Sequence, residues 1–255
     1  MTPNLQKASI SKRIAAALLD FILFTVLVAG AATLIANIVG YGDQIEIVEA
    51  RQKFFEEKYG ISFLITEEEY NTKYTEEQRK QYDAAFEGLV NDEQFVLAYN
   101  MQINLSMIII TFGVLFGILI VEFLIPLFLK NGQTVGKKVF NLGLVRTDGV
   151  QVTTLPLFIR ALLGKFTIES MIPVYIFLMI FFNTANAVSL GILVALLFSQ
   201  IVCLILSRTN SAIHDLLSGT VVVDLSTQMV FRSKEDLLEY TKKIHAERAN
   251  RSDYK

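Results

Sequence analysis

The chain has 255 residues, of which 53% are hydrophobic and 19% are charged, and its mean hydropathy is +0.46. This composition is typical of a protein that crosses a membrane several times, and it argues against a soluble enzyme. The formal net charge of −2 gives no overall basic character, so we expect no nucleic-acid partner. The only cysteine, Cys203, excludes a disulfide within one chain.

Four apolar runs are candidate membrane spans: residues 14–40, 103–129, 168–182 and 187–206. A helix needs about 20 apolar residues to cross a bilayer. A buried helix of a soluble protein is the alternative for any one run, but four such runs favour a membrane bundle. The third run is short and contains Pro173, so its helix could begin earlier, near residues 161–163. The first run is too long for a signal peptide and contains Asp20, which indicates a retained span.

The distribution of charge predicts the topology. The outer insert, residues 42–100, carries fourteen acids and six bases, whereas the rest of the chain is net basic. Bases near the ends of the runs are Lys7, Lys12, Arg13, Lys130, Lys137, Lys138, Arg146, Arg160, Lys165 and Arg208. The turn between the third and fourth runs, residues 183–186, has no charge. By the positive-inside rule we expect both termini in the cytoplasm and the outer insert on the other side.

The outer insert has the pattern of amphipathic helices. Thr66 with Glu69, and Thr75 with Gln78, match the capping box that begins a helix. One helical face is predicted to contain Tyr82, Phe86, Leu89 and Val90, continued by Phe95, Val96 and Tyr99. We expect a helical hairpin in solvent, and the alternative is a docking surface for an external protein partner.

The segment after the second run changes to strand-forming sequence. Residues 131–133 are predicted as a turn and residues 139–146 as a strand. Thr147-Asp148-Gly149 is a hairpin signal before residues 150–152. Residues 219–224 have the same strand character, so we expect a small cytoplasmic sheet in which the hairpin meets this late strand.

Two further helices are predicted on the cytoplasmic side. Pro156 lies in the first turn of an amphipathic helix that continues through Arg160 and Lys165. We expect this helix to lie at the inner interface before the third span. Ser233 and Asp236 form a capping pattern at the start of a charged helix in the tail.

Together these elements predict an all-α membrane protein. It is a four-span transmembrane helical bundle with a helical extracytoplasmic insert and a small cytoplasmic β-hairpin/strand element. The expected regions are residues 1–41 (cytoplasmic N-terminus and first span), 42–100 (acidic insert), 101–225 (spans two to four with the cytoplasmic link) and 226–255 (charged cytoplasmic tail).

Three charged residues suggest a family. Arg13 at the start of the first span, Asp20 within it, and Asp215 in Ser-Ala-Ile-His-Asp215-Leu-Leu-Ser-Gly resemble the arginine and two aspartates that name the RDD family. The segment Gly132-Gln-Thr-Val-Gly136-Lys-Lys-Val is similar to that family's link after its second span. The resemblance covers residues 12–40 and 103–225 and implies a multi-pass bacterial membrane protein. Some members are described as cation/proton antiporters, but the long acidic insert departs from the family pattern.

Arg13 and Asp20 are seven residues apart, which is roughly 10 Å along a helix and too far for a direct pair. Asp215 follows the fourth run by a few residues, on the same membrane side as Arg13. We therefore predict an Arg13–Asp215 contact that ties the first span to the chain beyond the fourth and sets an inner gate. The alternative is that Arg13 only anchors the topology by meeting lipid phosphate.

Counting residues inward from the basic end of each span places three other polar residues at a similar depth in the membrane. Asp20, Glu122 and Gln200 each lie seven or eight residues from a basic residue at the cytoplasmic end of a span, at a depth of about 10–12 Å. Two carboxylates and an amide at one level are predicted to bind a proton or a hard cation. The alternative is a structural set of protonated acids that form hydrogen bonds between helices.

His214 next to Asp215 invites a catalytic interpretation. Neighbouring side chains do not readily aim at one substrate, however, and no serine or cysteine motif accompanies them. We interpret His214 as a structural or pH-sensing residue. Metal-ligand spacings such as HExxH or CxxC are absent from the sequence. We therefore predict no catalytic residue, no metal site and no cofactor, and we do not expect an enzyme.

The leading functional hypothesis is proton-coupled transport or antiport of a small cation in the bacterial cytoplasmic membrane. Asp20 and Glu122 would compete for the cation and the proton. The expected partners are the lipid bilayer, the cation and the proton, and a homo-oligomer would help so small a transporter. The alternative is a non-transporting membrane scaffold or accessory subunit that binds protein partners through the outer insert.

Overall fold

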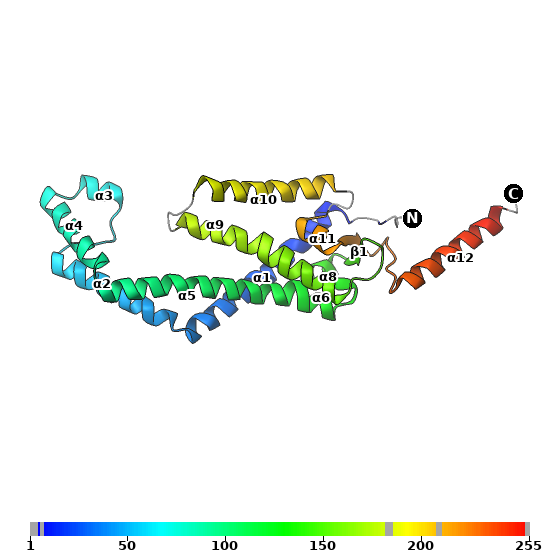
Figure 1. Ribbon diagram of the computed structural model, residues 1–255, viewed down its shortest axis with the longest axis horizontal. Coiled ribbons are helices and arrows are strands. Elements are labelled where there is room, and N and C mark those ends of the chain that lie inside the picture. The colour runs from blue at the N-terminus through cyan, green and yellow to red at the C-terminus, as the bar shows by residue number, and fades with distance from the viewer. Residues whose placement is uncertain (1–4, 6–7, 182–185, 208–210, 253–255) are drawn as a thin grey trace. The chain divides into compact units, whose positions relative to one another are not determined.

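The computed structural model describes residue 5 and residues 8–181, 186–207 and 211–252, without the side chains of Lys130 and residues 248–252 (Figure 1). The chain divides into two compact units, each described by itself below. The larger combines residues 1–28 with residues 114–255, and the smaller comprises residues 29–113.

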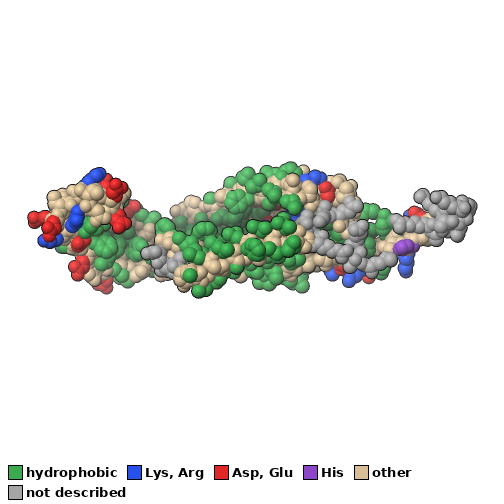
Figure 2. All heavy atoms as spheres, turned by 90° about the horizontal axis from the view of Figure 1, so that it is seen from above, with side chains coloured by type: hydrophobic (Ala, Val, Ile, Leu, Met, Phe, Trp, Pro, Cys, Tyr) green, Lys and Arg blue, Asp and Glu red, His purple; other side chains and the backbone are tan. Residues whose placement is uncertain are grey.

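Four helices in the described part of the chain are long and apolar enough to span a membrane, as the sequence predicts. They are Ile10–Ile38 (α1), Glu93–Phe128, Thr154–Phe181 and Ala187–Leu206 (α10). The second contains α5 (Glu93–Ile118), η1 (Leu119–Leu124) and α6 (Ile125–Phe128), and the third contains α8 (Thr154–Ile159), η3 (Arg160–Met171) and α9 (Ile172–Phe181). Apolar side chains cover much of the face in Figure 2, and α10 buries very few of its own side chains, as a lipid-facing helix does.

The prediction of a separate interfacial helix before the third span is wrong. The helix that begins at Thr154 continues without a break to Phe181. Arg160 and Lys165, which were expected to face lipid headgroups, instead contact an acid on the second span. Because these bases find their partners inside the bundle, the helix has no polar face to lay on the membrane surface.

Both the second and third spans contain a π-helical segment, η1 and η3. Each segment ends two residues before a proline, Pro126 or Pro173. Proline lacks the N–H that would continue the α-helical ladder, and a π-helical turn is one way to accommodate it. Such turns often occur at functional sites.

The predicted contact between the two distant strand segments is confirmed. β1 (Leu142–Arg146) pairs antiparallel with β2 (Thr220–Asp224), with Leu142 opposite Asp224 and Arg146 opposite Thr220. The expected hairpin is only partly formed, because Val150 and Gln151 make isolated bridges rather than a strand. The strand was predicted to begin at Val139, but that residue ends the short helix α7 (Val135–Val139), and β1 begins at Leu142. One apolar cluster packs around the sheet: Ala8, Ala16, Leu142, Leu144, Val152, Leu157 and Val222.

The smaller unit is helical, as expected. α2 (Tyr41–Tyr59) packs on α4 (Glu76–Val90), and α3 (Glu67–Thr72) lies between them in sequence. Both predicted capping boxes are present, Thr66 with Glu69 and Thr75 with Gln78.

The predicted apolar face of α4 is partly wrong. Phe86 is 52% exposed and Val90 is also exposed, whereas Ala85 and Leu89 are buried. The ring of Phe55 on α2 lies so close to Gly88 that a Cβ atom there would approach it to 2.7 Å. This close approach sets the rotation of α4, so the face through Ala85 and Leu89 becomes the buried one.

The charged tail forms α12 (Lys234–Ser252), and Ser233 and Asp236 cap it reciprocally as predicted. The turn expected at residues 183–186 lies outside the described residues except for Asn186, which caps α10. Lys7 and Arg208 also lie outside the described residues.

Candidate functional site

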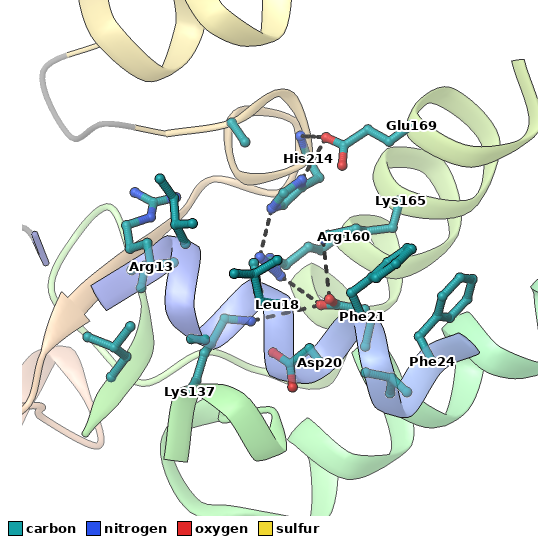
Figure 3. A pocket seen from close by; sticks show the side chains of 18 of the residues that line it. Arg13, Leu18, Asp20, Phe21, Phe24, Lys137, Arg160, Lys165, Glu169 and His214 are labelled. Carbon is teal, nitrogen blue, oxygen red and sulfur yellow. Dashed lines mark hydrogen bonds and ion pairs between the residues drawn. The ribbon is translucent and has the colours of Figure 1, made fainter. Parts of the chain in front are cut away.

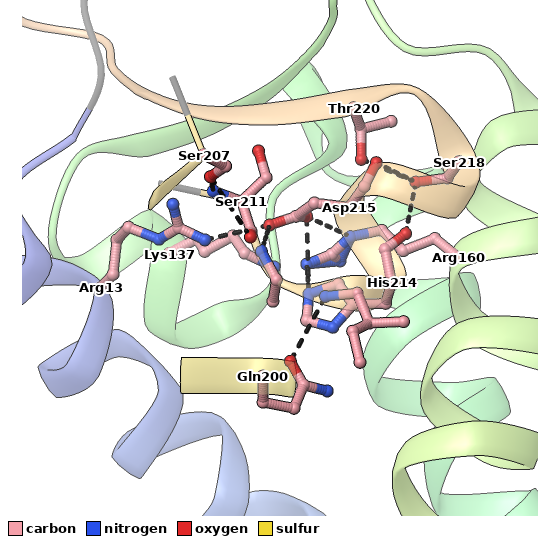
Figure 4. A network of polar contacts seen from close by, with 12 residues as sticks. Arg13, Lys137, Arg160, Gln200, Ser207, Ser211, His214, Asp215, Ser218 and Thr220 are labelled. Carbon is pink, nitrogen blue, oxygen red and sulfur yellow. Dashed lines mark hydrogen bonds and ion pairs between the residues drawn. The ribbon is translucent and has the colours of Figure 1, made fainter. Parts of the chain in front are cut away.

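A buried cluster of acids and bases lies in the larger unit, close to the ends of its candidate spans. Its centre is Asp215 on α11 (Ile213–Ser218), whose side chain is fully buried. The Asp215 carboxylate accepts hydrogen bonds from Arg13 Nη2 at 3.0 Å and from Arg160 Nε at 3.2 Å (Figure 4). The predicted contact between Arg13 and Asp215 is therefore present. Burial opposes ionisation of Asp215, but nearby positive charges outweigh it and hold its pKa well below the usual range. These charges are His214 in acid, where it is protonated, and Arg160 and Arg13 at every pH.

Arg160 connects the members of the cluster. Besides Asp215, it donates through Nη1 to Glu122 Oε2 at 3.3 Å and lies with Nη2 2.8 Å from His214 Nε2. A guanidinium can only donate, so His214 Nε2 must accept. The imidazole proton then lies on Nδ1, 2.6 Å from Glu169 Oε1. Burial, followed by the charge of Arg160, lowers the pKa of His214, so this side chain is neutral at neutral pH.

Glu122, on η1, is paired with three bases. Its carboxylate lies 3.3 Å from Arg160 Nη1, 3.3 Å from Lys165 Nζ and 3.9 Å from Lys137 Nζ. Arg160 and Lys165 both lie on η3 and are five residues apart. In a π-helix the backbone hydrogen bonds join residues i and i+5, so two side chains with this spacing lie on roughly the same face.

Asp20 holds the link between the second and third spans, residues 129–153, against α1. Its carboxylate accepts from Thr134 Oγ1 at 2.5 Å and from the backbone N–H of Gly136 at 2.7 Å, at the start of α7. A Cβ atom at Gly136 would lie 2.1 Å from the carbonyl oxygen of Ala16, so only glycine permits this approach. The contact brings Lys137 into the cluster.

Lys137 is the buried base of the link. Burial and the charge of Arg160 lower its pKa to about 8, and Glu122 and Asp20 oppose that shift only in part. The neighbouring Lys138, by contrast, is exposed.

The polar layer predicted by depth counting is only partly assembled. Asp20 and Glu122 line the same cavity, of about 560 Å³. Gln200 is not among the residues that line this cavity; it accepts a hydrogen bond from the backbone N–H of Ile213 (Figure 4) and is hydrogen-bonded to Glu169. Figure 3 shows Asp20, Lys137 and Arg160 around the cavity, with Leu18 and Phe21 of α1 on its wall.

Sequence reasoning missed four site residues: Lys137, Arg160, Lys165 and Glu169. A usable signal was present, because a carboxylate within a span needs a base nearby. Arg160 and Lys165 were the bases that precede the third run by only a few residues. Treating them as membrane-surface residues removed them from consideration.

The cluster can hold, exchange or conduct charge within a membrane bundle. Its acids and bases come from the first three candidate spans, from the link and from α11. Side chains of this kind are costly inside a bilayer and generally mark an ion or proton pathway or a structural ion pair.

No curated protein and no solved structure matches this chain. A family model described as the RDD family matches residues 7–219, which include Arg13, Asp20 and Asp215 and all the other residues of the cluster. The chain therefore belongs to the RDD family, and its four long apolar helices make it a membrane protein of that family.

Proposed function

We propose that the protein exchanges a small cation for protons across the bacterial cytoplasmic membrane, with the cluster as the exchange site. The observation that carries this proposal is the position of Asp20 and Glu122 on one cavity, among buried bases near the ends of the spans. Carboxylates are the groups that both a hard cation and a proton bind. A buried acid kept within a membrane bundle is by default a functional hypothesis.

The described conformation is closed to a cation. Glu122 has three basic partners, and both oxygens of Asp20 already accept hydrogen bonds. For a cation to bind, one of the two lysines, Lys137 or Lys165, must move away from Glu122. Arg160 is held by three partners and stays in place. The Arg13–Asp215 pair links α1 to α11 and would act as the inner gate.

The exchange is tested by proton flux in proteoliposomes with different cations. Asp20→Asn keeps the acceptor for the Gly136 N–H, and its amide can donate to Thr134 Oγ1, so the variant should fold. It should abolish cation-driven proton movement, because it cannot titrate. Asp43→Asn, an exposed acid of the smaller unit, is the control and should leave flux intact. Unchanged flux in folded Asp20→Asn would refute the proposed site.

The topology belongs to the same proposal. Both termini face the cytoplasm and the outer insert faces the other side, as the basic residues at the span ends favour. Single cysteines at Glu68 and Asp236, in a Cys203→Ser background, should react with an impermeant reagent from opposite sides. Reaction of both from one side would overturn this arrangement.

A scaffold is the second candidate function, favoured by apolar side chains that the smaller unit leaves exposed. Leu64 is 93% exposed, and Phe54 and Phe86 are also exposed. An external protein partner would cover such residues. Deletion of residues 44–98 should then abolish capture of the partner in a crosslinked pull-down without altering ion flux. If the wild-type protein shows no ion flux in proteoliposomes, the scaffold function is favoured over transport.

A further inference from the structure

The cavity beside the cluster has two chemically different sides. Its charged floor contains Asp20, Glu122, Lys137, Arg160 and Lys165. Its wall is apolar and comes mainly from α1, through Ile10, Ile14, Leu18, Phe21 and Phe24. A volume of about 560 Å³ is far more than a single ion needs and falls in the range of sites for organic ligands. The cavity therefore suits a molecule with both a charged group and an apolar chain.

The wall opens to the outside of the bundle. Leu18 and Phe21 line the cavity and are nevertheless 59% and 62% exposed. Both lie within a candidate span, so what surrounds them in a membrane is lipid. An acyl chain can enter along this wall without leaving the hydrocarbon layer.

The charge of the floor favours an anionic group. Among the described residues the lining contains four bases, Arg13, Lys137, Arg160 and Lys165, and three acids, Asp20, Glu122 and Glu169. Asp215 pairs with Arg13 and Arg160, so Lys137 and Lys165, which share Glu122, are the bases that can meet an anionic ligand. Of the lining residues that form ion pairs, Lys165 has the most exposed side chain, at 26%. The acids are engaged by donors: Asp20 by the link, Glu122 by three bases and Glu169 by His214. If a lipid phosphate pairs with Lys165, each of these acids still keeps at least one of its donors.

The depth of the floor matches a headgroup. Arg13 is three residues from the start of α1, and Arg160 is six residues from the start of α8. At about 1.5 Å per residue these two bases lie within roughly 10 Å of the helix ends. Lys165 is five residues beyond Arg160, about 16 Å from the start of the third span. That span has 28 residues and, at about 42 Å, is longer than the hydrocarbon core of about 30 Å, so its first turns can extend into the headgroup layer. The long Lys165 side chain then reaches toward the phosphates of the same leaflet. Basic pockets between spans are known to bind anionic headgroups.

We propose that an anionic phospholipid of the leaflet at this end of the spans binds in the cavity. Its phosphate pairs with Lys165, next to Lys137, and one acyl chain lies along Ile14, Leu18 and Phe21. This site follows from the shape and chemistry of the cavity alone and does not depend on whether the protein moves ions.

The test compares lipids on the intact protein in detergent. Phosphatidylglycerol, phosphatidylcholine with the same acyl chains, and inorganic phosphate are each added, and lipid retention is measured by native mass spectrometry together with the shift in Tm. We expect phosphatidylglycerol to be retained and to raise Tm, with phosphatidylcholine weaker and inorganic phosphate without effect. Equal retention of the two lipids, or an equal Tm shift with inorganic phosphate alone, would overturn the proposal.

Two variants locate the site. Lys165→Gln should weaken retention of phosphatidylglycerol about fivefold, the effect expected for one lysine near an anionic surface. Lys138→Gln removes an exposed lysine of the link and should leave retention unchanged. If Lys138→Gln weakens retention as much as Lys165→Gln does, the lipid is bound by general surface charge and the cavity site is wrong. If Lys165→Gln does not fold, the comparison of lipids on the wild-type protein still decides.

Discussion

Removal of the Arg160 guanidinium should destabilise the protein more than removal of any exposed charge. Arg160→Met keeps an unbranched apolar chain but takes donors from Asp215, Glu122 and His214. Asp215 retains Arg13 at 3.0 Å and Glu122 retains Lys165 at 3.3 Å, so neither acid is left wholly unpaired. His214 Nε2 loses its donor in a buried site.

The magnitude follows from these partners. Breaking a buried ion pair from one side costs about 3–5 kcal/mol, and a buried acceptor left without a donor costs about 1–3 kcal/mol. Because both acids keep one base, we expect a total loss of about 3–5 kcal/mol in the free energy of unfolding. The matched control is Arg146→Met, which breaks a half-exposed pair with Asp148 and should cost less than about 1 kcal/mol.

The assay is denaturant unfolding of the purified protein in detergent, followed by circular dichroism. Adding Glu122→Gln to Arg160→Met should not recover the loss, because it leaves Lys137 and Lys165 without the acid that they share. If Arg160→Met were within about 1 kcal/mol of Arg146→Met, the cluster would not stabilise the fold and its geometry would need another explanation.

Three further predictions concern single positions. Gly136→Ala should lower the free energy of unfolding by more than about 1–3 kcal/mol, because the new methyl group meets backbone, whereas Gly191→Ala, with nothing within 4 Å, should be neutral or stabilising. The pKa of Lys137 is about 8 in the folded protein and 10.5 in the reference state. Between these two pH values the unfolded chain binds more protons than the folded protein does. The free energy of unfolding should therefore rise with pH across this window, by up to about 3 kcal/mol. Lys137→Met should remove this rise and Lys138→Met should keep it, as pH-dependent unfolding would show; identical profiles would contradict the burial of Lys137. The pKa of His214 is lowered from 6.5, so stability should fall as the pH drops below about 6.5, and a His214→Gln protein with the same acid profile would contradict its buried neutral form.

The lengths of the apolar runs and the local capping patterns were enough to predict the four spans, the helical insert and the capped tail. Shared depth also predicted the contact between Arg13 and Asp215, because both residues are confined to one end of the bundle. These features depend on composition or on position along one axis, and a single sequence contains that information.

The partners of Asp20 and Gln200 depend on rotation about the helix axis, which depth counting does not give. Asp20 faces the link, where Gly136 permits a close backbone approach, and Gln200 faces α11. The π-helical turns add to the difficulty, since each one changes which face of the helix a following side chain occupies. Arg160 and Lys165 were missed because they were assigned to an interfacial helix, since the third span was predicted to start too late.

The most direct measurement of the proposed exchange records cation uptake and proton release together in the same proteoliposomes. The account predicts opposite movements of the two ions in the wild-type protein, lost in Asp20→Asn and weakened in Glu122→Gln, with both variants folded. Movement of neither ion in the wild type, or unchanged exchange in Asp20→Asn, would contradict it.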